Sequence, residues 1–368
     1  ADAAIRETVA TLIAKAVTAE EKARAIYAFC CRNIRYVAVE YGQAGYTPHA
    51  AADIFGNKYG DCKDQAVLLV TMLRCAGLSA WPVLIPTKTC YDLDPDFPAI
   101  FFDHCIAAVK IEDAVVFMDP TAETCSFGDL PVPDQQRRVL IYKEDTYAIT
   151  QTPMFAPEHN RVIQKSAVRI APDETMDAEK TVTTFGSFNQ AQRYWLLYTP
   201  PQLVEEVLAA KIQETSIGGK LLSYSVVNLQ DLSLPVVLKY RYGGPEYVMT
   251  AGALRILPQL FSVDVSATAK PFREFAIDLG DLESRQTDIE ITFPQDWEVY
   301  YIPPSLEKSS PWMRFKVAYS KKGNTIICRQ EIEHKTSVVP VAEYPRYKAF
   351  IESLARGLKQ RIILEQKR

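Results

Sequence analysis

The chain has 368 residues, of which 48% are hydrophobic and 23% are charged, a balance typical of folded rather than disordered proteins. A formal charge of −4, with no long basic run, argues against a surface for nucleic acid or anionic lipid. No run of about 18 apolar residues is present that could span a bilayer. The length exceeds one ordinary domain of about 150 residues and predicts two or three domains.

The cysteines and histidines are dispersed. There is no C-x-x-C pair, and the four histidines are scattered, so we expect no metal site, no disulfide scaffold and no cofactor. Most cysteines are interpreted as small buried hydrophobic residues, with Cys62 as the exception. The eight are Cys30, Cys31, Cys62, Cys75, Cys90, Cys105, Cys125 and Cys328.

The chain starts directly in a helical pattern, without an initiator Met or the features of a signal peptide. This is expected both after removal of a signal peptide and in a fragment, and the sequence leaves the two open. Apolar residues recur at helical spacing from Ile5 to Ile13. Thr18 and Glu21 then form a capping box, and a second helical pattern follows through Cys30.

A third helix is predicted after a loop. Residues 41–60 are rich in Gly, Pro and Asn and predict irregular structure. The helical pattern returns at Asp61, the expected N-cap, and Gly77 stands where a glycine commonly ends a helix.

The periodicity then changes to that of strands. Residues 80–85 predict one strand, and residues 106–111 and 114–118 predict a hairpin around Glu112-Asp113.

A segment rich in Pro and charge at 129–160 is interpreted as an exposed linker. Beyond it the pattern alternates as in strands, except for helices near 200–214 and at 345–360. The predicted fold is therefore α+β: a catalytic domain at 1–150, then a β-rich, antiparallel, sandwich-like region at 151–368, with a further boundary considered near 268.

Cys62 falls at the first turn of the third helix, directly after a glycine-containing loop that ends in Gly60-Asp61. Backbone N–H groups at a helix start are unpaired and partly positive, which favours a thiolate and can receive an oxyanion during acyl transfer. Asp61 opposes this by repelling a thiolate, so an imidazolium partner would be needed. On position alone, a structural buried cysteine is an equally good interpretation.

His104 and Asp119 lie at the two ends of the predicted hairpin. With a two-residue turn they become diagonal neighbours on one face, which long side chains can bridge. A carboxylate that holds one imidazole nitrogen leaves the other free for a thiol. Taken singly, His104 could be a strand histidine bonded to backbone, and Asp119 a turn residue. The order Cys, His, Asp together favours a catalytic triad.

These motifs resemble the transglutaminase-like superfamily. GDCKD opens a helix, DHC begins a strand and MDPT ends the next strand, and the resemblance covers residues 20–125. Gly45–His49, Tyr59–Asp64 and residues 343–364 are similar to bacterial members that join such a core to flanking β-rich domains.

The resemblance implies a papain-related catalytic fold, with Cys62 as nucleophile, His104 as base and Asp119 as orienting acid. It further implies a protein or peptide substrate and an exported, periplasmic location. Bacterial members usually carry another β-domain upstream, which implies that this chain is truncated.

Gln43 and Asp61 are additional candidates for the oxyanion site or the substrate groove. An upstream glutamine has the oxyanion role in papain-like enzymes, although a solvated loop glutamine is the alternative for Gln43. His49 is interpreted as structural, and Lys63 and Asp64 as supports of the helix start.

The predicted activity is thiol-dependent acyl transfer from peptide or side-chain amides through a thioester. Hydrolysis is favoured over crosslinking, because no signature of a calcium-switched crosslinking enzyme is visible. The alternative is a non-catalytic interaction protein, in which the core is a scaffold and the β-rich region binds a partner.

Overall fold

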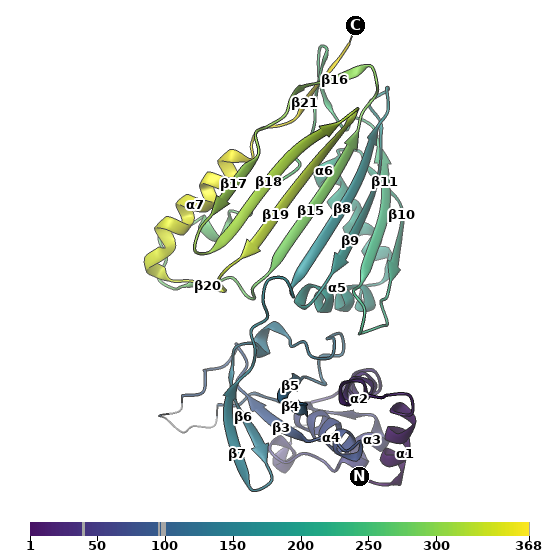
Figure 1. Ribbon diagram of the computed structural model, residues 1–368, viewed down its shortest axis with the longest axis vertical. Helices are drawn as coiled ribbons and strands as arrows, with labels where there is room; N and C mark the ends of the chain where they lie inside the picture. The colour runs from purple at the N-terminus through teal and green to yellow at the C-terminus, as the bar shows by residue number, and fades with distance from the viewer. Residues whose placement is uncertain (39–40, 95, 97–100, 368) are drawn as a thin grey trace. The chain divides into compact units, whose positions relative to one another are not determined.

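The computed structural model describes residues 1–38, 41–94, 96 and 101–367 (Figure 1). The chain divides into two compact units, the first made of Ala1–Met154 with Asp231–Ser233 and the second of Phe155–Gln230 with Leu234–Arg368. Helix makes up 28% and strand 34% of the structure, which confirms the α+β class. No helix in the described ranges is long and apolar enough to cross a bilayer.

The first unit packs helices against an antiparallel five-stranded sheet of order β5-β4-β3-β6-β7 (Figure 1). Its elements are α1 (Ala3–Leu12), α2 (Ala19–Asn33), β1 (Arg35–Tyr36), the 3-10 helix η1 (Gly42–Gly45), α3 (Ala51–Asn57), β2 (Tyr59–Gly60), α4 (Cys62–Cys75), β3 (Ala80–Ile85), β4 (His104–Ile111), β5 (Ala114–Met118), η2 (Val132–Asp134), β6 (Arg138–Lys143) and β7 (Thr146–Gln151).

Local capping signals are confirmed in this unit. Thr18 and Glu21 form the capping box of α2, and Asp61 is the N-cap of α4. Gly77 follows the end of α4 with a φ of +79°, a left-handed conformation that glycine adopts without strain. Helix α4 is buried along most of its length and packs against β3 and β4, so it positions whatever lies at its first turn.

Two segments differ from the prediction. The loop expected at 41–60 contains α3, a helix of about two turns whose Ile54 is buried in the core. The linker expected at 129–160 contains β6 and β7, of which β6 pairs with β3 and buries Val139 and Ile141. The prolines and charges of this segment lie mainly in the turns that flank the strands. The overall composition of the segment therefore indicated a linker, although it contains two strands.

The second unit is built on an eight-stranded sheet of order β10-β11-β9-β8-β15-β19-β18-β17. Its elements are β8 (Arg161–Ile170), β9 (Met176–Thr184), α5 (Ser187–Tyr198), α6 (Pro201–Thr215), β10 (Lys220–Val227), β11 (Val237–Gly244), β12 (Met249–Ala251), β13 (Leu254–Ile256), η3 (Ser266–Thr268), β14 (Ile277–Asp278), β15 (Ser284–Thr292), β16 (Trp297–Tyr301), β17 (Leu306–Ser309), β18 (Met313–Lys322), β19 (Thr325–His334), β20 (Val338–Val339), η4 (Val341–Glu343), α7 (Tyr344–Gly357) and β21 (Ile363–Gln366).

This sheet is antiparallel, as predicted, except that β8 and β15 pair in parallel. Strands on both sides of residue 268 share it, so the boundary considered there does not separate two sheets. The predicted helices near 200–214 and 345–360 are present as α6 and α7, whereas α5 is an additional helix.

Alternate residues of the large sheet are buried, for example Ala178 but not Glu179 in β9, the pattern of a sheet covered on one face. The covered face shares one apolar core with α5, α6 and α7 and with a small sheet of order β12-β13-β21-β16. Both helices and a small sheet cover this face, whereas the sequence predicted a sandwich-like packing of sheets.

Candidate active site

Cys62 is the first residue of α4 and is partly exposed. Gly60, two residues before Cys62, is buried, and a Cβ built on it would lie 2.6 Å from Asp64 Cβ. Any side chain at position 60 would therefore displace the first turn of the helix. The glycine before the cysteine is needed for the close approach of the chain to α4.

Asp61 is completely buried and caps the helix by accepting a hydrogen bond from the Asp64 N–H at 3.2 Å. The Lys63 ammonium donates to the same carboxylate. Lys63 therefore offsets the negative charge beside Cys62 that the sequence led us to regard as unfavourable for a thiolate. The carboxylate of Asp61 is thus enclosed, and its proposed part in the oxyanion site or groove stays a prediction.

His49 supports the same helix start. Its backbone N–H donates to Asp64 Oδ1 at 2.8 Å, and its Nδ1 lies 3.0 Å from Asp64 Oδ2. The side chain of Asp64 is 5% exposed, whereas that of His49 is 47% exposed. His49 thus anchors the preceding loop to α4, in agreement with its structural interpretation.

The hairpin has the predicted register. Ile111 pairs with Ala114 across the two-residue turn, and Ala107 pairs with Met118. His104 is the first residue of β4, and Asp119 directly follows the last residue of β5. The two ends meet, since His104 Nε2–H donates to Asp119 Oδ2 at 3.1 Å.

Asp119 also makes the turn that was considered as its alternative role. Its Oδ1 accepts hydrogen bonds from the Thr121 N–H at 2.9 Å and the Thr121 hydroxyl at 2.7 Å. One carboxylate oxygen therefore fixes the turn while the other holds the imidazole. The two interpretations of Asp119 are compatible.

The electrostatics favour an ion pair. Burial alone would lower the pKa of His104, but hydrogen bonds with Asp119 and Cys62 and the charge of Asp119 outweigh it and raise that pKa to about 11. Burial would raise the pKa of Asp119, yet the contact with His104 lowers it. The histidine is thus held as imidazolium against a carboxylate.

The Cys62 side chain lies near the His104 ring, and its interaction with the ring raises the pKa of His104. Since Nε2 is engaged by Asp119, Nδ1 is the nitrogen left to face the thiol. The structure therefore brings together the three side chains selected from the sequence, from a helix start and two strand ends. Their catalytic roles stay predictions.

Asp134 joins this group although the sequence did not single it out. It is the last residue of η2, is 2% exposed, and one of its carboxyl oxygens lies within 4.8 Å of a carboxyl oxygen of Asp119. Burial and the charge of Asp119 raise the pKa of Asp134 to about 7. No pattern marked it, because it lies in a proline-rich turn of the segment interpreted as a linker.

His104, Asp119 and Asp134 each offer one nitrogen or oxygen ligand, and these atoms lie within 4.8 Å of one another. Within the described part of the chain, this is the one such group compact enough to hold a metal ion. Nitrogen and carboxylate ligands would suit a divalent cation. An ion there would compete with the contact between His104 and Asp119.

Gln43 lies in η1 and is exposed. Its proposed contact with an oxyanion stays a prediction. The eight cysteines are all free thiols, and five of them are buried, namely Cys30, Cys31, Cys105, Cys125 and Cys328. Three remain at least partly accessible to reagents: Cys62, Cys75 and Cys90.

Comparison with known proteins agrees with the fold of the first unit. Residues 6–120 match the model of the transglutaminase-like superfamily, and residues 254–364 match a domain of unknown function with a solved structure, DUF3858. No curated protein matches the chain. The first unit thus contains a transglutaminase-like domain, as its motifs predicted.

Two solved structures are similar. One is described as a "putative protease" from Parabacteroides distasonis, with 13% identity and a TM-score of 0.59 over 98% of this chain and 55% of that one. The other is described as a "putative cysteine protease" from Cytophaga hutchinsonii, with 19% identity and a TM-score of 0.25 over 32% of this chain and 37% of that one. The chain thus spans about half the length of the first, with which it shares its fold.

Proposed function

We propose that the first unit is a thiol-dependent acyl-transfer enzyme that cleaves peptide or side-chain amides, with hydrolysis as its main reaction. The observation that carries the proposal is the continuous contact from Cys62 through His104 to Asp119 at the start of α4. The transglutaminase-like domain supports thiol-dependent chemistry, and the likeness to a structure described as a "putative protease" supports amide cleavage.

In the proposed reaction, the Cys62 thiolate attacks the carbonyl carbon of a bound amide, and His104 is its imidazolium partner. The oxyanion forms beside the first turn of α4. There an α-helix leaves its first N–H groups unpaired, and here the N–H groups of Cys62 and Lys63 precede the capped N–H of Asp64. These two donors are the proposed oxyanion site.

The imidazolium of His104 then gives its proton to the leaving amine, and the C–N bond breaks. This leaves a thioester on Cys62 and a neutral imidazole. A water molecule gives a proton to His104 and attacks the thioester, releasing a carboxylic acid and restoring the thiolate–imidazolium pair. An amine in place of water would complete a transamidation.

Asp119 holds the imidazole in orientation and stabilises its charged form. Asp134 is proposed as a positioning residue behind it. With a pKa of about 7, its carboxyl is largely neutral in weakly acidic solution and can donate to Asp119 without adding a second charge. The two acids would then share one negative charge opposite one imidazolium.

The test is an assay of ammonia or amine release from peptide amides, with incorporation of a fluorescent primary amine measured in parallel. Wild type should release amine, and Cys62→Ala should not. Cys75→Ala is the matched control, since Cys75 is an exposed thiol at the opposite end of the same helix. Equal turnover by wild type and Cys62→Ala would refute the proposal.

The alternative of a non-catalytic scaffold predicts a different thiol reactivity. An activated Cys62 should be alkylated by iodoacetamide well below the pH of about 8.5 at which an ordinary thiol ionises. Peptide mapping separates Cys62 from Cys75 and Cys90. If all three react with one pH profile and no amide is cleaved, the scaffold interpretation is favoured.

We also propose a periplasmic location, which rests on the resemblance to exported bacterial proteins. Fractionation of a native bacterial host tests it, and recovery of the protein only with cytoplasmic markers would overturn it.

A further inference from the structure

A lysine interrupts an apolar row in the second unit. In β9 the residues on the covered face of the sheet are Met176, Ala178, Lys180, Val182 and Thr184. Lys180 pairs across the sheet with Ser166 on one side and Tyr240 on the other, so it lies well inside the sheet. A lysine there is costly to bury unless its charge is matched.

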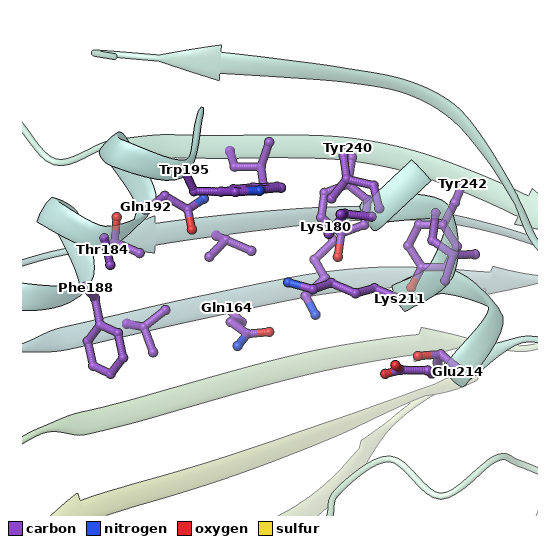
Figure 2. Close-up of a pocket in the computed structure, with 18 of the residues that line it drawn as sticks. Gln164, Lys180, Thr184, Phe188, Gln192, Trp195, Lys211, Glu214, Tyr240 and Tyr242 are labelled. Carbon is purple, nitrogen blue, oxygen red and sulfur yellow. The ribbon is translucent and has the colours of Figure 1, made fainter. Parts of the chain in front are cut away.

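Lys180 lines a pocket of about 650 Å³ between this sheet and the helices α5 and α6 (Figure 2). The floor comes from alternate residues of β8, β9 and β11, and the walls come from the two helices. Its aromatic lining consists of Phe188, Trp195, Tyr240 and Tyr242. The volume suits a small organic molecule rather than a single ion.

The charges in the pocket are mainly positive. Lys180 comes from the sheet, and Lys211 comes from α6 with its ammonium 5.8 Å from the centre of the Trp195 ring. Figure 2 shows both lysine side chains reaching into the same part of the pocket. Arg285 also lines it but is paired with Glu283, and Glu214 is the one acidic side chain of the lining.

No salt bridge of Lys180 is present among the described residues, and the charge that acts on it most is the like charge of Lys211. Burial, and then that neighbouring charge, lower the pKa of Lys180 to about 8. The amide nitrogen of Gln192, which also lines the pocket, is buried and without a hydrogen-bond partner in the described structure. The Lys180 ammonium and the Gln192 amide nitrogen therefore have no paired acceptor in the described structure.

We propose that this pocket binds a small organic carboxylate with an aromatic or aliphatic body. The carboxylate would lie between Lys180 and Lys211, and its negative charge would relieve their repulsion. Its hydrogen bonds with the ammonium groups would be stronger than those between neutral groups, because both partners are charged. The body would lie against Trp195 and Phe188, whose faces are apolar. This binding site is separate from the thiol chemistry of the first unit and does not depend on it.

The test uses 4-phenylbutyrate as the probe and its neutral amide as the matched ligand, with binding to the full chain measured by titration calorimetry at pH 7. The carboxylate should bind at least roughly tenfold more tightly than the amide, as hydrogen bonds to charged groups predict. Lys180→Met should remove this preference while leaving binding of the amide unchanged. Acetate, which lacks the body, should bind much more weakly than 4-phenylbutyrate.

Lys239→Met is the control, because Lys239 is exposed on the opposite face of β11 and carries the same charge. It should bind as the wild type does. Lys211→Met provides a second variant if Lys180→Met fails to fold, because Lys211 is the more exposed of the two lysines, and it should also weaken binding of the carboxylate. Equal binding of carboxylate and amide, an unchanged preference in both lysine variants, or no binding of either ligand would overturn the proposal.

Discussion

The buried carboxyl of Asp134 lies beside that of Asp119, with an oxygen of each within 4.8 Å of the other, so the acid that holds His104 has a second buried acid next to it. The two residues come from different local structures, a 3-10 turn and the end of a strand. Burial and the neighbouring charge of Asp119 raise the pKa of Asp134 to about 7, so its carboxyl is mainly protonated below that pH.

The first prediction concerns Asp134. Asp134→Asn keeps a neutral donor and should retain most amide cleavage near pH 7, whereas Asp134→Leu should lower kcat/KM by roughly tenfold or more by removing the polar group beside the Asp119 carboxylate. A merely structural role would affect stability in both variants without changing the pH profile. Kinetics from pH 5 to 9 on both variants, with thermal melts, distinguish the two.

The stability of these variants should also depend on pH. The pKa of Asp134 is raised from 3.8 to about 7 on folding, so the unfolded chain releases its proton first as pH rises. Wild type should therefore lose stability relative to Asp134→Asn between about pH 4 and 7, and the difference should then stay constant. Urea denaturation at several pH values measures this, and a constant difference from pH 4 to 7 would contradict it.

The second prediction concerns His104 and Asp119. Because the pKa of His104 is raised to about 11, its ring should remain protonated at pH 8, which nitrogen NMR of the imidazole can detect. In Asp119→Asn the pKa of His104 should fall, because the charge and the main acceptor are lost. Amide cleavage should decrease, but by less than the roughly 10⁴-fold loss in a serine triad, since a thiol is intrinsically more nucleophilic.

The stabilising effect of this pair has a defined pH window. The raised pKa of His104 contributes stability that is complete below about pH 6.5 and declines as pH rises toward 11. The lowered pKa of Asp119 contributes stability that is lost as pH falls below about 4. In Asp119→Asn, the free energy of unfolding should depend less on pH, both below about pH 4 and above about pH 6.5. A variant with unchanged turnover and an unchanged His104 titration would leave Asp119 as a turn residue only.

The third prediction concerns Gly60. Gly60→Ala should destabilise the protein by about 1–3 kcal/mol, because its Cβ would overlap Asp64 and force the start of α4 to shift. Amide cleavage should fall as well, since Cys62 is on that turn. Gly56→Ala is the control: no atom lies within 4 Å of its new Cβ, and alanine in α3 should stabilise by about 0.5–1 kcal/mol. Denaturant titrations of both variants should give effects of opposite sign.

The fourth prediction concerns Lys180 in the absence of any ligand. Lys180→Met should be more stable than wild type at pH 7 by about 1–3 kcal/mol, because a poorly matched charge is no longer buried. The pKa of Lys180 falls from 10.5 to about 8 on folding, so this difference should shrink as pH rises from about 8 to 10.5. Lys239→Met should show no such trend.

The charged and titratable groups around Lys180 are Lys211 and Glu214 on α6, Tyr240 and Tyr242 on β11, and Arg285 on β15. These groups are the same in wild type and in Lys180→Met, so the difference in the free energy of unfolding between the two reports on Lys180 itself. A destabilised Lys180→Met with normal secondary structure would mean that the ammonium already has a favourable environment.

Much of the first unit was predictable because its signals are local. A capping box such as that of Thr18 and Glu21 requires hydrogen bonds over only three residues, and the register of the hairpin follows from its two-residue turn. Cys62, His104 and Asp119 could be selected from the sequence because each lies at the end of a helix or strand that local patterns predict.

The remaining features depend on contacts between distant segments. The sequence contains nothing that brings Asp134 to Asp119, or that pairs β6 with β3, because those contacts form only when the sheet assembles around α4. The same holds for the parallel pairing of β8 with β15 and for the pocket around Lys180, whose lining comes from strands and helices far apart in the chain. Local hydrogen bonding determined the elements and the candidate triad, whereas the burial of charge, which sets the pKa values of Asp134 and Lys180, was decided only by tertiary packing.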